Sequence, residues 1–117
     1  KYAVLSRDTY SKNFEVTKNY YTGINAATMS AIAGRAMQGR EIANTVISLI
    51  GDKQAGIWER ATLGEAYLLT KNRERCVDYY IKARTLAGND WGKVLSVHNQ
   101  LWLLNHYIPV PKEVMRI

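Results

Sequence analysis

The clearest structural signal in this chain is the sequence LGEAYLLTKNRERCVDYYIKA, residues 63–83. Small and large side chains occur in it at the spacings that two closely packed antiparallel helices require. Gly64 and Cys76 are small and leave room for the backbone of the partner helix, while larger side chains fill the space around it. The positions that carry this pattern are Leu63, Gly64, Tyr67, Cys76, Tyr80 and Ala83.

This pattern resembles one tetratricopeptide (TPR) unit, in which a small residue, an aromatic residue and an alanine follow in this order. The closing proline of that unit is absent, because Gly88 stands near its place. Trp58 and Trp91 are 33 residues apart, and each enters a predicted helix. A period in the mid-thirties with paired helices is typical of TPR arrays. The resemblance implies a protein that holds other proteins.

Hydrophobic periodicity predicts five or six helices with short connections, which favour antiparallel neighbours. The expected helices span residues 4–20, 22–33, 40–50, 57–70, 74–87 and 91–107, the last with Asp90 as its N-cap. We therefore predict an all-α domain over residues 1–107, a TPR-like α-α superhelix of about three antiparallel helix pairs. Residues 108–117 contain both prolines and are predicted to be a C-terminal extension leading out of the domain.

A second stretch, YTGINAA at residues 21–27, is unusual as the opening of a helix. Gly23 costs nearly 1 kcal/mol in a helix relative to alanine, so its placement indicates close approach of another helix or a nonstandard first turn. Asn25 can hydrogen-bond a neighbouring backbone group.

These residues, followed by Ile57-Trp58 and by Trp91 leading to LWLL at 101–104, resemble the TRAF-binding, TPR-like domain. That domain occurs in the central regulatory region of the apoptosis signal-regulating kinases and in bacterial proteins. The order and spacing agree over residues 5–107. The resemblance implies an interaction scaffold that communicates with TRAF-class adaptors and with a neighbouring kinase.

The composition is that of one globular domain, with 117 residues, 47% hydrophobic residues and a net charge of +6. The single cysteine excludes an intramolecular disulfide and favours a reducing, cytoplasmic location. No apolar run approaches the ~18 residues of a spanning helix, so no membrane contact is expected. Because the chain begins at Lys1 rather than Met, we expect it to be part of a longer regulatory or signalling protein.

No catalytic or metal-binding constellation is predicted, so we expect neither an enzyme nor a cofactor. Cys76 lacks a histidine partner at a known signature spacing. His98 and His106 are eight residues apart on one helix, and no further ligand completes a metal site. Residues 34–41 faintly resemble a phosphate loop but lack its Lys-Ser/Thr ending, which favours a turn between helices.

In TPR-like stacks the first helix of each pair faces the concave surface. Carried over to this chain, that rule predicts a groove for a protein or peptide partner. The predicted groove residues are Tyr21, Thr28, Trp58, Glu65, Leu68, His98 and Trp102.

Two alternatives stay open beside the scaffold. The net charge of +6 permits a nucleic-acid-binding helical repeat, although acidic residues are interspersed among the basic ones. A structural role, bracing adjoining domains or forming a homodimer, is favoured by residues 91–104, which carry more apolar side chains than one helix face needs. Whether residues 108–117 occupy the groove is also open.

Overall fold

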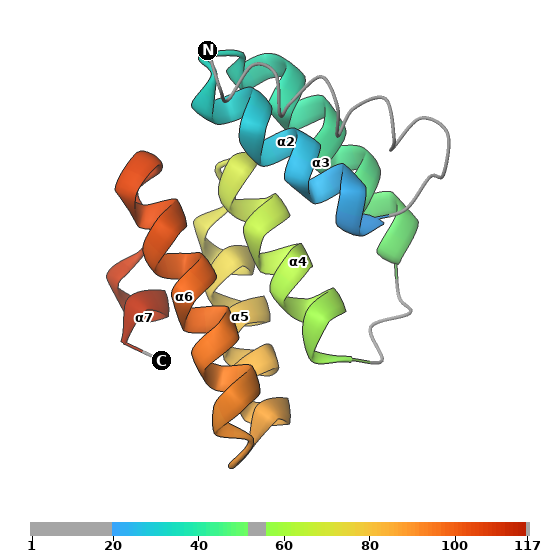
Figure 1. The fold of residues 1–117 in the computed structure, drawn as a ribbon. Helices are drawn as coiled ribbons and strands as arrows, with labels where there is room; N and C mark the ends of the chain where they lie inside the picture. The colour runs from blue at the N-terminus through green and yellow to red at the C-terminus, as the bar shows by residue number, and fades with distance from the viewer. Residues whose placement is uncertain (1–19, 52–55, 117) are drawn as a thin grey trace.

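The computed structural model describes residues 20–51 and 56–116. Within these two ranges the chain forms helices and no strand, so the predicted all-α class is confirmed (Figure 1). The helices are α2 (Tyr20–Ile32), α3 (Ala36–Ile50), α4 (Ile57–Leu69), α5 (Arg73–Ala87), α6 (Trp91–Tyr107) and α7 (Lys112–Met115). The helix predicted at residues 4–20 lies outside the described residues, apart from its last residue, which begins α2.

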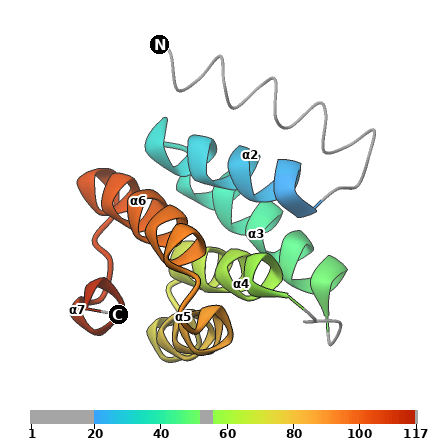
Figure 2. The same cartoon turned by 60° about the horizontal axis from the view of Figure 1, so that its bottom comes forward.

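Two helical hairpins, α2 with α3 and α4 with α5, form most of the fold, and α6 packs against the second hairpin (Figures 1 and 2). In Figure 1 the helices α2, α4 and α6 face the viewer, and α5 lies behind α4 and α6. After α6 comes the single turn α7, which contacts both α5 and α6. The two hairpins match the expected antiparallel pairing, while the superhelix remains a prediction.

The start of α3 differs from the prediction. The turn expected over residues 34–41 is shorter, since α3 begins at Ala36 and Gly39 lies inside it and is buried. A Cβ atom on Gly39 would lie 2.9 Å from the backbone oxygen of Ala27 in α2. This glycine therefore permits the close crossing of α2 and α3, and it does not end a helix. By contrast, Asp90 caps α6 as predicted, because its Oδ1 accepts a hydrogen bond of 3.3 Å from the Lys93 amide.

The α4–α5 crossing uses the small residues of the sequence pattern in a different way from that expected. A Cβ atom on Gly64 would lie 2.6 Å from the Cδ2 and Cε2 atoms of Tyr80. The space that Gly64 leaves is thus filled by an aromatic ring and not by the partner backbone. Tyr67 stacks on Tyr79, with 5.6 Å between the ring centroids. The remaining positions of the pattern are all buried: Leu63, Cys76 and Ala83.

The segment after α6 folds back onto the domain, although the two prolines had predicted that it would lead away. Val110 and Val114 are buried in a cluster with side chains of α4, α5 and α6. The Val110 amide donates a hydrogen bond of 3.0 Å to Oδ1 of Asn105, and Arg73 forms an ion pair with Glu113. The prolines end α6, but apolar side chains beyond them bring the chain back. The domain boundaries themselves stay a prediction.

None of the helices in residues 20–51 and 56–116 combines the length and the apolar character needed to cross a membrane.

Candidate partner-binding groove

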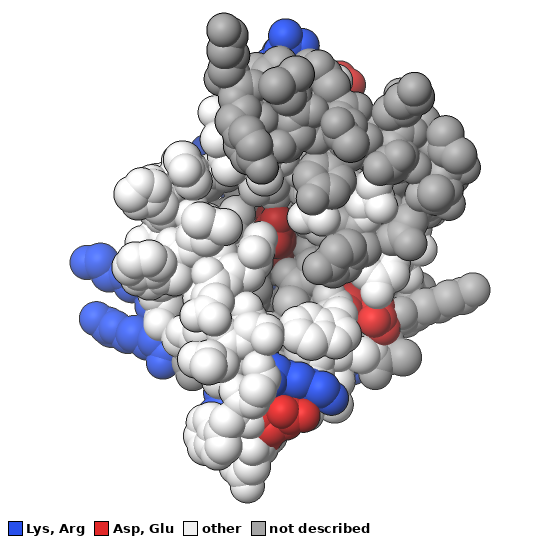
Figure 3. All heavy atoms as spheres, in the orientation of Figure 1, with Lys and Arg blue, Asp and Glu red and all other residues white. Residues whose placement is uncertain are grey.

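A cavity of about 310 Å³ lies between α2, α4 and α6, the helices in the foreground of Figure 1. Its walls are formed by Ile24, Asn25, Trp58, Ala61, Thr62, Glu65, Tyr80, Ser96, Val97 and Gln100. Figure 3 shows this face of the molecule, with acidic atoms in the hollow near its centre. We refer to this cavity as the α2–α4–α6 groove.

Helical spacing explains why these side chains meet. On α4 the lining residues are Trp58, Ala61, Thr62 and Glu65, which follow the i, i+3, i+4, i+7 order of one helix face. On α6, Ser96 and Gln100 are four residues apart and also share a face. The groove is therefore the meeting point of one stripe from each helix.

Glu65 is the central polar group of the groove. Its side chain is only 6% exposed, and its Oε2 atom accepts a hydrogen bond of 2.5 Å from Oγ1 of Thr28 on α2. Gln100 on α6 forms a second side-chain hydrogen bond with Glu65. Burial raises the pKa of Glu65 to about 7, although these two hydrogen bonds act in the opposite direction.

No lysine or arginine occurs among the described residues that line the groove. Within residues 20–51 and 56–116, Glu65 thus has neutral hydrogen-bond partners, and the groove lining supplies no cation beside it. Its two titratable neighbours stay neutral at ordinary pH, since burial raises the pKa of Cys76 to about 12 and that of Tyr80 well above its usual value. The described lining of the groove is consequently a mixture of apolar and neutral polar side chains with one acidic group, Glu65.

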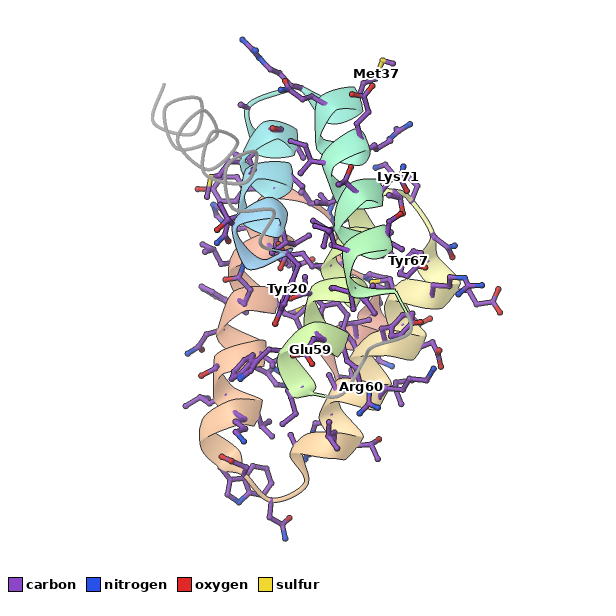
Figure 4. All side chains as sticks on the ribbon, turned by 90° about the vertical axis from the view of Figure 1, so that its right-hand side faces the viewer. Tyr20, Met37, Glu59, Arg60, Tyr67 and Lys71 are labelled. Atoms are coloured by element: carbon purple, nitrogen blue, oxygen red, sulfur yellow. The ribbon has the colours of Figure 1, made fainter. Side chains whose placement is uncertain are left out.

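Contacts at the start of α4 hold α2 and α4 together at one end. The Gly56 amide donates a hydrogen bond of 2.8 Å to Oε2 of Glu59, which completes the N-terminal capping of α4. The Tyr20 hydroxyl donates a hydrogen bond of 3.3 Å to Oε1 of the same carboxylate. Figure 4 shows Tyr20 and Glu59 side by side. One carboxylate therefore caps α4 and links it to the first residue of α2.

Three of the predicted groove residues meet in this cavity. Trp58 and Glu65 line it, and Thr28 is buried against Glu65. Trp58 is 44% exposed, so part of its indole ring is open to solvent. Tyr21 lies on α2, but its side chain is outside the described part of the structure.

Three other predicted groove residues lie elsewhere. Leu68 is buried in the cluster beneath residues 108–116, beside a separate cavity of about 420 Å³. His98 lines a small space of about 20 Å³ between α5 and α6. Trp102 is 75% exposed and lies on the outside of α6. Residues 108–116 do not line the groove. The part of the C-terminal tail that the structure describes therefore does not occupy it.

Sequence reasoning did not select Ser96 and Gln100, which line this cavity from a different side of α6 than the two residues it named. His98 and Trp102 each follow one of these residues by two positions. Two positions correspond to about 200° around a helix, so the residues chosen face away from the groove. Apolar residues surround α6 on all sides, and no periodicity in its sequence fixes which side is buried. Asn25 was noted for its backbone bonding and also lines the groove.

The outer side of α6 is a second surface of interest. Its large apolar residues that are more than half exposed are Trp91, Leu95, Trp102, Leu103 and Tyr107. This agrees with the excess of apolar side chains seen in the sequence. What these residues contact stays a prediction.

The basic residues of α5 make contacts within the chain. Arg73 pairs with Glu113, Lys82 pairs with Asp78, Arg75 lies over the Tyr67 ring, and Arg84 lies over the Trp91 ring. Their charges thus have partners or ring contacts in the fold itself.

In comparison with known proteins, the family model described as the MAP3K TRAFs-binding domain matches residues 5–116 of the chain. The matched range includes the segment that folds back after α6. No curated protein and no solved structure matches the chain.

Proposed function

The chain belongs to the MAP3K TRAFs-binding domain family, and we propose that it is a non-catalytic interaction module of a larger cytoplasmic signalling protein. In this proposal the α2–α4–α6 groove takes a segment of a partner protein. The observation that carries the proposal is the groove itself, in which one helix from each pair supplies side chains to a shared cavity. Binding would act by tethering and positioning the partner.

The walls of the groove suit a peptide segment. Trp58 offers an aromatic surface that is partly exposed, and Ile24 and Val97 add apolar area. Asn25 and Gln100 add amide groups that can bond to a peptide backbone. Aromatic anchors surrounded by a few polar groups are typical of peptide and ligand sites, and the volume of about 310 Å³ is within the usual range.

The description of the family points to TRAF adaptors as partners. We therefore propose a TRAF-class adaptor as the first protein to test. The contacts that the basic residues of α5 make within the chain support a protein partner over nucleic acid.

A pull-down from nuclease-treated lysate at about 0.15 M salt, together with titration of purified TRAF proteins, tests the proposal. The groove is blocked with Ser96→Trp, which places an indole in the cavity from an exposed position on α6. Asn99→Trp is the matched control, because Asn99 is exposed on the same helix and does not line the groove. We expect S96W to lose the partner and N99W to keep it. Equal retention by both variants would refute the groove as the binding site.

A second candidate function is bracing or homodimerisation through the outer side of α6. It is favoured by the exposed apolar residues there, of which Leu95 is 62% exposed and Trp102 is 75% exposed. Sedimentation of the wild type and of a Leu95→Glu, Trp102→Glu variant tests it. A dimer that becomes a monomer in the variant supports this role, and a monomeric wild type argues against self-association.

A further inference from the structure

We propose that the α2–α4–α6 groove selects partner segments that carry a basic side chain, arginine or lysine, whose cationic group pairs with Glu65. This inference rests on the proposed function and adds the chemistry by which the partner is recognised. It predicts a specific residue type in the bound segment.

The first step of the argument is the unusual position of the carboxyl group. Glu65 is 6% exposed, yet it lines a cavity of about 310 Å³, so the group is withdrawn from solvent on the protein side and faces an unfilled space. Taking a carboxylate out of water is costly unless a cation or hydrogen-bond donors compensate it. A glutamine of nearly the same size would avoid this cost.

The second step is the nature of the compensation that the chain supplies. Thr28 and Gln100 each provide a neutral hydrogen bond. No lysine or arginine is present among the described residues that line the groove. A carboxylate can accept more hydrogen bonds than these two, so it retains capacity for a donor that comes from outside.

The third step is charge complementarity with an incoming group. A guanidinium or ammonium group supplies both a positive charge, which the described lining lacks, and additional donors, and it forms the stronger, charge-assisted type of hydrogen bond. Asn25 and Gln100 contribute amide oxygens that can accept the remaining protons. Trp58 bounds the same groove with a partly exposed indole, on which the aliphatic stem of a basic residue or its neighbour can pack. A neutral or acidic side chain would gain none of the charge pairing.

The experiment uses a random dodecapeptide phage library as the probe, selected on the whole chain at pH 8. Selections on E65Q and S96W are run in parallel, with E41Q as the charge-matched control, because Glu41 is exposed on α3 and does not line the groove. Peptides enriched on the wild type and lost on S96W are taken as groove ligands. Their affinities are then measured with the basic residue present and with arginine replaced by citrulline, which is neutral and nearly isosteric.

We expect the groove ligands to share one arginine or lysine. Its replacement by citrulline should weaken binding to the wild type and to E41Q by roughly 30-fold or more, as for removal of one partner of a buried charge pair. On E65Q the same replacement should change affinity by less than about 3-fold, since the pairing charge is gone. If E65Q does not fold, the citrulline effect on the wild type is measured again at pH 5, where protonation of Glu65 should reduce it to less than about 3-fold.

Three results would overturn the inference. Groove ligands without a common basic residue, or an equal citrulline effect on the wild type and E65Q, would leave a peptide groove that does not use Glu65 for charge recognition. The absence of any ligand that depends on the open groove would overturn the inference and the proposed function together.

Discussion

The substitution Glu65→Gln should remove a large pH dependence of the stability of this domain. Glu65 is buried, and its pKa is raised from 4.5 to about 7 in the folded chain. Since the folded state holds the proton more tightly than the unfolded state, the carboxyl group is accommodated without penalty at acidic pH. Its penalty grows as the pH rises from about 4.5 to about 7, so stability falls over that window.

The size of the effect follows from the shift. One pKa unit corresponds to about 1.36 kcal/mol, so the difference between 4.5 and about 7 gives a loss on the order of 3 kcal/mol. Most of this loss falls between pH 5 and pH 8. A domain with a total stability of about 5–15 kcal/mol should show such a change clearly.

Urea denaturation of the wild type and E65Q at intervals from pH 5 to pH 8 measures this change in the free energy of unfolding. E65Q should gain stability relative to the wild type by about 2–3 kcal/mol across this range, while E41Q should follow the wild type. Arg73 lowers the pKa of Glu113, so this exposed group loses its contribution as the pH falls, opposite in sign to Glu65. Glu113 is present in all three proteins, and its effect cancels in the comparison. Parallel curves for E65Q and the wild type would refute the burial argument.

Three further perturbations test the packing. Gly39→Ala should lower the free energy of unfolding by about 1–3 kcal/mol, because the added Cβ would lie 2.9 Å from the backbone oxygen of Ala27. Gly92→Ala meets no such contact and should leave the free energy of unfolding unchanged or slightly higher. Urea unfolding of the two variants makes the comparison. Cys76 is fully buried with a pKa near 12, so its alkylation by iodoacetamide should be far slower in the folded than in the denatured chain. Val114→Ala should destabilise the domain by about 2 kcal/mol in a single transition; an unchanged midpoint would show that the C-terminal segment does not stabilise it.

The sequence was most informative where side-chain size alone determines the packing. The small and large residues of residues 63–83 predicted the α4–α5 hairpin, and Asp90 predicted the start of α6, because caps and close crossings require particular residue types. The same reasoning failed at Gly39, since a glycine inside a helix and a glycine that ends one look alike in the sequence. Only the position of α2 distinguishes the two cases.

The groove was predictable only in part, because which side of a helix faces its neighbours also depends on how the helices pack. The rule carried over from TPR-like stacks named Trp58 and Glu65 as groove residues, and the structure places both in the lining of the cavity. Which side of α6 faces them depends on the burial of Leu101 and Leu104, two of many apolar residues on that helix. The fold of residues 108–116 likewise depends on a space beside α5 that no local pattern reveals.

Glu65 connects three helices of the fold. Through Thr28 it bonds to α2, through Gln100 it bonds to α6, and it is itself part of α4. A change at this carboxyl group, whether loss of a proton or arrival of a cation, therefore alters contacts between neighbouring helix pairs as well as contacts with a ligand. In arrays of helical repeats the interfaces between neighbours supply much of the stability. A partner that engages Glu65 would thus act on the relative position of α2, α4 and α6, which offers a physical route for passing on the binding event.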